Sequence, residues 1–128
     1  MLFDINGRQQ TRIPHRQNYN RWRRRLSDAD HEQIMETLFH VMNQAIESGE
    51  AQGENGIFNS SFIPGANWTG TPYQPIYEAC GQDFEQAQLF YGLLVWEAVM
   101  LHDDDWIFIR QQNTPEHPLG LTYFLGRE

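Results

Sequence analysis

The sequence contains no lysine, a single cysteine and no apolar run long enough to cross a membrane. Cys80 has no second cysteine with which to form an internal disulfide, and a lone thiol without an evident base is expected to be buried. The longest apolar run, from Gly92 to Leu101, is interrupted by Glu97. The chain does not open with a charged segment, an apolar stretch and a cleavage site. These absences predict a cytoplasmic protein that makes no membrane contact.

Motifs for catalysis, metal binding and cofactor binding are also missing. Glu32, Glu36 and His40 recur at intervals of four residues, but no Glu-x-x-His pair would complete a metal site, and a solvated helix face explains them. His102 and the acidic run 103–105 lack the alternating ligands and the glycine of a calcium loop. We therefore expect a non-enzymatic protein with no catalytic residues, no metal and no cofactor.

Positive charge is concentrated in the first part of the chain of 128 residues. Residues 1–25 contain seven arginines and one acid, a net charge of +6. Residues 26–128 contain two arginines and 16 acids, a net charge of −14. Because lysine is absent, every cation is a guanidinium, which suits bidentate pairing with carboxylate or phosphate and stacking on aromatic rings.

The first 26 residues show no sustained hydrophobic period, and we interpret them as an arginine-rich N-terminal arm that precedes a single domain over residues 27–128. The arm has three alternative partners: the acidic domain of its own chain, another subunit, or nucleic acid tracked by arginine with an aromatic ring stacked on a base. The candidate contacts to an anion or an acidic partner are Arg16, Arg21, Trp22, Arg23, Arg24 and Arg25.

The domain has the composition of an α+β fold. Ser27 is a good N-cap for a long amphipathic helix over 28–48. The elements that follow are a strand over 57–63, a short helix within 73–81, a second long helix over 83–101, and a C-terminal β-hairpin built from 106–110 and 121–125. This order resembles a winged-helix domain in outline, although no sequence motif accompanies it.

The winged-helix resemblance implies DNA binding, but the residues at the expected contact elements do not suit it. Asp83 and Glu85 stand at the start of the helix that would enter the major groove, where they would face phosphates. The loop of the hairpin offers Glu116 and His117 and no lysine. Binding of nucleic acid is therefore expected only through the arm.

Two further features indicate contacts. The helix over 83–101 is apolar on two sides and must be covered on both, so its second stripe is a candidate protein interface formed by Leu89, Leu93, Trp96 and Met100. The loop 60–73, with Trp68 and Tyr73, is a candidate functional loop, or else it seals the core. An enzyme remains a third alternative that rests on this loop and on the acidic run 103–105.

We therefore predict a small protein-interaction module that self-associates as a homodimer or docks another protein. The alternative is nucleic-acid binding through the arginine-rich arm.

Overall fold

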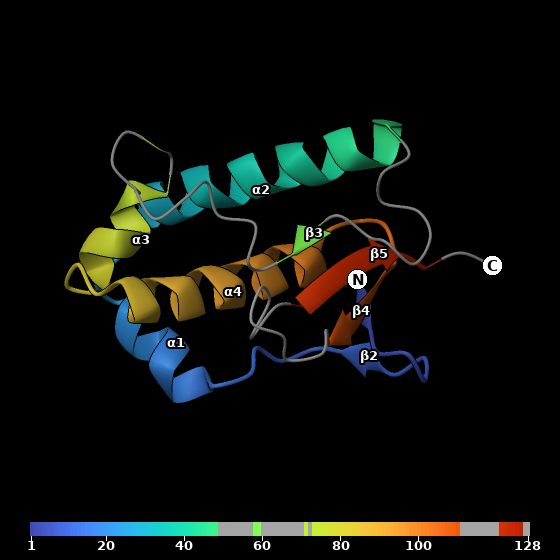
Figure 1. The fold of residues 1–128 in the computed structure, drawn as a ribbon, viewed down its shortest axis with the longest axis horizontal. Helices are drawn as coiled ribbons and strands as arrows, with labels where there is room; N and C mark the ends of the chain where they lie inside the picture. The colour runs from blue at the N-terminus through green and yellow to red at the C-terminus, as the bar shows by residue number, and fades with distance from the viewer. Residues whose placement is uncertain (49–57, 60–70, 72, 111–120, 127–128) are drawn as a thin grey trace.

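In the computed structural model of the chain, the residues described are 1–48, 58–59, 71, 73–110 and 121–126. They form an α+β fold (Figure 1). In chain order the elements are β1 (Leu2–Phe3), β2 (Gln9–Gln10), α1 (Arg16–Arg23), α2 (Asp28–Ser48), β3 (Phe58–Asn59), α3 (Gln74–Ala79), α4 (Phe84–Leu101), β4 (Trp106–Arg110) and β5 (Leu121–Leu125).

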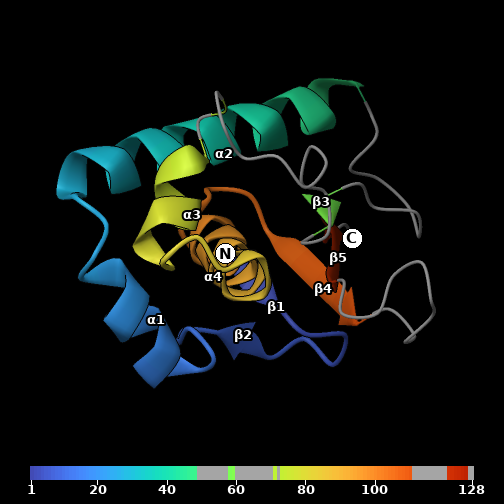
Figure 2. The ribbon, with the colours of Figure 1, turned by 60° about the vertical axis from the view of Figure 1, so that its left-hand side comes forward.

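Helix α4 is the centre of the molecule. Figure 2 looks nearly along its axis and shows α1, α2, α3 and the sheet arranged around it. Nine of its residues are buried, because apolar side chains occupy both the stripe through Phe90 and Leu94 and the stripe through Leu93 and Trp96. The prediction that this helix is covered on two sides is confirmed, and the cover comes from the same chain.

The strands form one sheet in the order β2-β1-β4-β5-β3. β4 and β5 are antiparallel, with Trp106 opposite Leu125 and Arg110 opposite Leu121, which confirms the predicted C-terminal hairpin. β3 adds to the other edge of β5, so the strand predicted over 57–63 is present at residues 58–59, and its other positions lie outside the described residues. β1 runs parallel to β4 and carries β2 on its outer edge.

The predicted N-terminal arm is not confirmed, because residues 1–26 contribute two strands and a helix to the packed structure. Tyr19 and Trp22 are buried three residues apart, which places them on one side of α1, and Leu26 is buried in the turn that follows the helix. Leu2 of β1 is fully buried. Sequence periodicity did not predict this short apolar stripe because arginines surround it.

The winged-helix resemblance remains a prediction. The strands β4, β5 and β3 have the neighbours that this arrangement requires, whereas β1 and β2 extend the sheet beyond it.

The local signals at helix ends act as expected. The Ser27 hydroxyl accepts a hydrogen bond from the backbone N–H of Asp30 at 3.1 Å, which confirms it as the cap of α2. Asp83 caps α4 in the same way through the N–H of Gln86, also at 3.1 Å. Gly81, with φ of 67°, ends α3 in the left-handed conformation that glycine adopts without strain.

The packing of α1 makes a testable prediction about the core. Replacing Trp22, which is 2% exposed, with alanine removes a large buried ring and should lower the free energy of unfolding by about 3–5 kcal/mol. Urea unfolding followed by circular dichroism measures the change. The control is Leu89→Ala on α4, where a side chain that is 50% exposed should cost within about 0.5 kcal/mol. Equal stability of the two variants would contradict the packing of α1 as part of the core.

Candidate functional site

The candidate site is the outer side of α1 and of the turn that follows it. Its exposed cations are Arg16, Arg21, Arg24 and Arg25, which we call the arginine face. Gln17 and Asn20 are exposed between them, so this side of the helix carries no acid. The opposite side of α1 is apolar and packs on α4, which fixes the direction in which the arginines project.

Glu97 of α4 holds α1 against the domain through a hydrogen bond to the buried side of the helix. The Tyr19 hydroxyl donates a hydrogen bond to Glu97 Oε1 at 2.7 Å. His31 of α2 places its Nε2 at 2.9 Å from the same oxygen. The His31 and Glu97 side chains are only 18% and 16% exposed, so one mostly buried carboxylate joins three helices.

The charge on Glu97 is stabilised by these partners. Burial alone raises its pKa, but the hydrogen bonds from His31 and Tyr19, with the charges of His31 and Arg23, lower the pKa below its ordinary value. Burial and the neighbouring Glu97 both raise the pKa of Tyr19, so the phenol keeps its proton. Tyr19 therefore remains a donor and Glu97 an acceptor over the physiological range.

Trp22 is the second anchor of α1. Its ring lies 5.7 Å from the ring of Phe90, centre to centre, and its Nε1 donates to Gln86 Oε1 at 3.3 Å. We predicted Trp22 as a contact to an anionic partner, but burial in the core leaves it no face on which a base could stack.

The arginines themselves have few internal partners. Arg23 pairs with the exposed Asp28 at 2.8 Å and also donates to the Leu26 carbonyl at 2.9 Å. Arg21 donates to Asn18 Oδ1 at 3.0 Å, and its guanidinium lies 5.4 Å from the centre of the Trp22 ring. Among the residues described, the arginine face forms no ion pair with a carboxylate. Among the described residues, pairing with the acidic part of the same chain is therefore seen for Arg23 and not for the arginine face.

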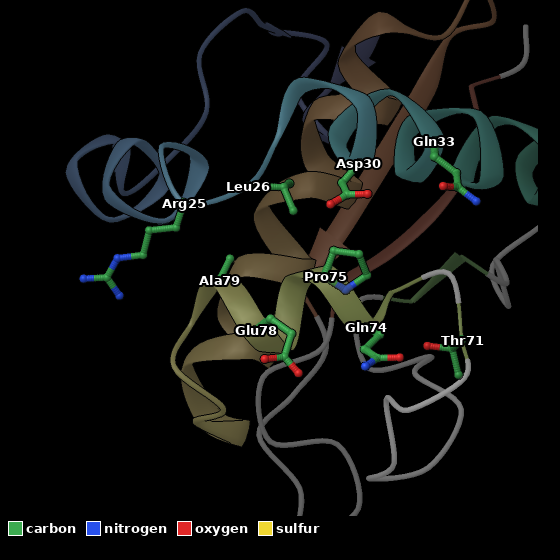
Figure 3. Close-up of a pocket in the computed structure, with 9 residues that line it drawn as sticks. All are labelled: Arg25, Leu26, Asp30, Gln33, Thr71, Gln74, Pro75, Glu78 and Ala79. Atoms are coloured by element: carbon green, nitrogen blue, oxygen red, sulfur yellow. The ribbon is translucent and has the colours of Figure 1, made fainter.

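A pocket of about 460 Å³ adjoins the arginine face, between the start of α2 and α3. Figure 3 shows Arg25 at its rim with the guanidinium directed away from the other side chains. Carboxylates and amides supply hydrogen-bonding groups to it. Sequence reasoning missed this pocket because its walls come from distant segments. The lining residues are Arg25, Leu26, Asp30, Gln33, Thr71, Gln74, Pro75, Glu78 and Ala79.

The predicted apolar interface on α4 lies mostly inside the chain. Leu93 and Trp96 are 8% and 6% exposed. The Trp96 Nε1 donates to the Arg12 carbonyl at 3.0 Å, and its ring lies 4.9 Å from that of Phe108. Met100 is half-buried and Leu89 is exposed. The N-terminal segment and β4 therefore cover the middle of this stripe.

The candidate loop 60–73 is described only at its end. Tyr73 is buried and meets Tyr91 edge-on, with ring centres 5.2 Å apart, as expected if this end of the loop seals the core. Trp68 lies outside the described residues.

The residues weighed for catalysis or metal binding form no cluster of three in the part of the chain that the structure describes. Glu32, Glu36 and His40 are exposed along α2. Burial raises the pKa of the Cys80 thiol to about 12, so the reactive thiolate is scarce at neutral pH. Within the described ranges, no three side chains of histidine, cysteine, aspartate or glutamate converge on a point where a metal ion could bind. Across the same ranges, no helix has both the length and the apolar character of a membrane span.

The hydrogen bonds that Glu97 accepts from Tyr19 and His31 predict how Glu97→Gln changes the stability of the fold. The substitution keeps the shape of the side chain but removes the charge that accepts from Tyr19 and His31, and it should lower the free energy of unfolding by about 1.5–3 kcal/mol near neutral pH. Urea unfolding measures this loss. The matched control is Glu36→Gln on the exposed side of α2, with an expected change within about 0.5 kcal/mol.

The same variant should also alter the pH dependence. The pKa of Glu97 is lower in the folded chain than its unfolded value of about 4.3, so the unfolded chain takes up the proton first as the pH falls. The stabilisation by ionised Glu97 is complete above that value and is lost below it. The gap between wild type and Glu97→Gln should therefore shrink in acid. A gap that stays constant through this range would contradict an ionised Glu97.

Comparison of the chain with protein-family models, with curated proteins and with solved structures finds no match.

Proposed function

We propose that the protein is a non-enzymatic interaction module that uses the arginine face of α1 to contact an acidic protein surface. The single observation that carries the proposal is the exposure of Arg16 and Arg21 on a helix held by Glu97, and of Arg24 and Arg25 in the turn after it, without carboxylate partners among the described residues. The predicted self-association is retained, with the contact moved from the apolar stripe of α4 to these arginines.

A fixed helix lowers the entropic cost of binding. Arginines on a disordered arm would lose backbone freedom on docking, whereas the α1 backbone is already ordered by Tyr19 and Trp22. Planar guanidinium groups also pair with two carboxylate oxygens at once. The arginine face therefore suits a surface with several exposed carboxylates.

A second copy of the chain offers such a surface. Asp103, Asp104 and Asp105 are exposed in the turn after α4. Arg25 lies near Cys80, just before α4, because its charge and that of Asp83 both act on the Cys80 thiol. The acidic turn lies at the opposite end of α4 (Figure 1). An 18-residue helix is about 27 Å long, well beyond the screening length of about 10 Å at 0.1 M salt. The two charged ends therefore do not neutralise each other within one molecule, and copies can associate head to tail.

Nucleic acid is the second candidate partner, because the arginine face has no acid between its cations. Contact would be limited to the phosphate backbone, since Trp22 is buried. The winged-helix arrangement, which we retain as a proposal on the neighbours of β5, adds no support for groove binding. Its second long helix, α4, is mostly buried by the rest of the chain, with Asp83 as its N-cap and Glu85 in its first turn.

Sedimentation velocity across a salt series tests the proposal. At about 0.05 M salt the average mass should rise above 15.1 kDa as protein concentration increases, and it should return to the monomer value near 0.5 M salt because screening weakens the contact. The triple variant Arg21→Gln, Arg24→Gln, Arg25→Gln should stay monomeric. The triple variant Asp103→Asn, Asp104→Asn, Asp105→Asn should lose association equally.

The matched control removes three exposed acids elsewhere, through Glu32→Gln, Glu36→Gln and Glu47→Gln, and should associate as wild type does. A wild-type protein that stays monomeric at low salt would overturn the proposed self-association. If that monomer binds a single-stranded oligonucleotide, with an affinity that falls with salt and with the arginine substitutions, nucleic acid is the partner instead.

A further inference from the structure

His102 lies where the C-terminal end of α4 meets α2 and β4. It is the residue that caps the C-terminal end of α4, and it is 9% exposed. Its ring lies 5.7 Å from the Trp106 ring in an edge-on arrangement and 6.0 Å from the ring of Phe39. A polar ring at this depth needs hydrogen bonds on both nitrogens.

The hydrogen bonds fix one neutral form of the ring. Nδ1 lies 3.1 Å from the indole nitrogen of Trp106 and 3.1 Å from the backbone nitrogen of Asp104, and both of those groups are donors. Nδ1 must therefore be the acceptor, so the proton is on Nε2. That nitrogen lies 2.9 Å from Oδ1 of Asn43 on α2 and donates to it.

A second proton cannot be added without breaking this arrangement. It would have to bind Nδ1, where it would point at the N–H groups of Trp106 and Asp104. Burial has the largest effect on the pKa of His102 and lowers it. The carboxylates of Asp104 and Asp103 raise this pKa, whereas the Met1 ammonium lowers it further. The net result is a pKa below the ordinary value of histidine. The ring contacts Asn43 and Phe39 of α2 and Trp106 of β4, which are uncharged side chains.

The protonated ring has an alternative partner nearby. One carboxylate oxygen of Asp104 lies 3.8 Å from Nδ1, and this side chain is 57% exposed. A ring that turned toward this carboxylate would gain an ion pair at the surface and give up both N–H donors. Met1 lies against the same residues. Its ammonium donates to the carbonyls of His102 and Asp104. The N–H of Trp106 donates to the Met1 carbonyl at 2.8 Å.

We propose that His102 is a pH-sensitive latch. In its neutral form it holds α2, α4 and β4 together, and uptake of a solvent proton at Nδ1 in mildly acidic solution releases Trp106 and the turn 103–105. This proposal rests on the contacts of His102 alone and is independent of the proposed function.

Unfolding equilibria measured across pH test the latch. Because the folded chain resists the proton that the unfolded histidine accepts at a pKa of about 6.5, stability is retained above that pH and lost below it. The unfolding equilibrium constant should rise by up to tenfold per pH unit between about pH 6.5 and the lower pKa of the folded chain. His102→Gln should lose this step, whereas His40→Gln, at an exposed site on α2, should retain it.

NMR of the wild-type protein tests the same claim without a substitution. Long-range nitrogen–proton correlation should show His102 as the Nε2–H form near pH 7, with the Trp106 indole proton protected from exchange. Acidification should collapse that protection while the amides of α1 remain protected. A proton on Nδ1 near pH 7, or a Trp106 indole that stays protected while His102 becomes charged, would overturn the proposal. A pH step that is identical in wild type and in a folded His102→Gln variant would also overturn it.

Discussion

The structure depends on one carboxylate placed inside a helical core. Glu97 lies on the most buried helix of the protein, where an unpaired charge would cost far more than any single contact returns. It is tolerated because Tyr19 and His31 both donate to it from neighbouring helices. The charge therefore requires α1, α2 and α4 to keep one relative placement, which a purely apolar contact would specify less strictly.

This constraint connects the core to the surface. Tyr19 and Trp22 take the inner side of α1, so the arginines that alternate with them can only project outward. The result is a helix whose two sides have opposite roles: one completes the core and the other concentrates positive charge on an otherwise acidic molecule. The C-terminal end of α4 also combines a buried contact with an exposed charge. His102 contacts α2 and β4, while the three aspartates after it remain exposed.

The sequence predicted the helices and strands that have strong hydrophobic periodicity, but it did not predict the side-chain contacts that connect them. The long helices and the hairpin follow from apolar spacing and turn residues, and the structure confirms them. The position of Glu97 within the longest apolar run was itself a signal that a buried carboxylate needs partners, but nothing in the chain identifies Tyr19 and His31 as those partners, because they come from segments 78 and 66 residues away. The short stripe of α1 was hidden by arginine, since eight residues contain too few turns to establish a period.

Helix α1 is part of the packed domain and presents its arginines from a fixed backbone. Native-state hydrogen exchange compares the amides of α1 directly with those of α4. We predict protection in the last turn of α1, where the amides of Arg21 to Arg23 have intrahelical partners, within about tenfold of that in the middle of α4. Exchange of these amides at the rate of an unstructured peptide, while α4 stays protected, would contradict the claim.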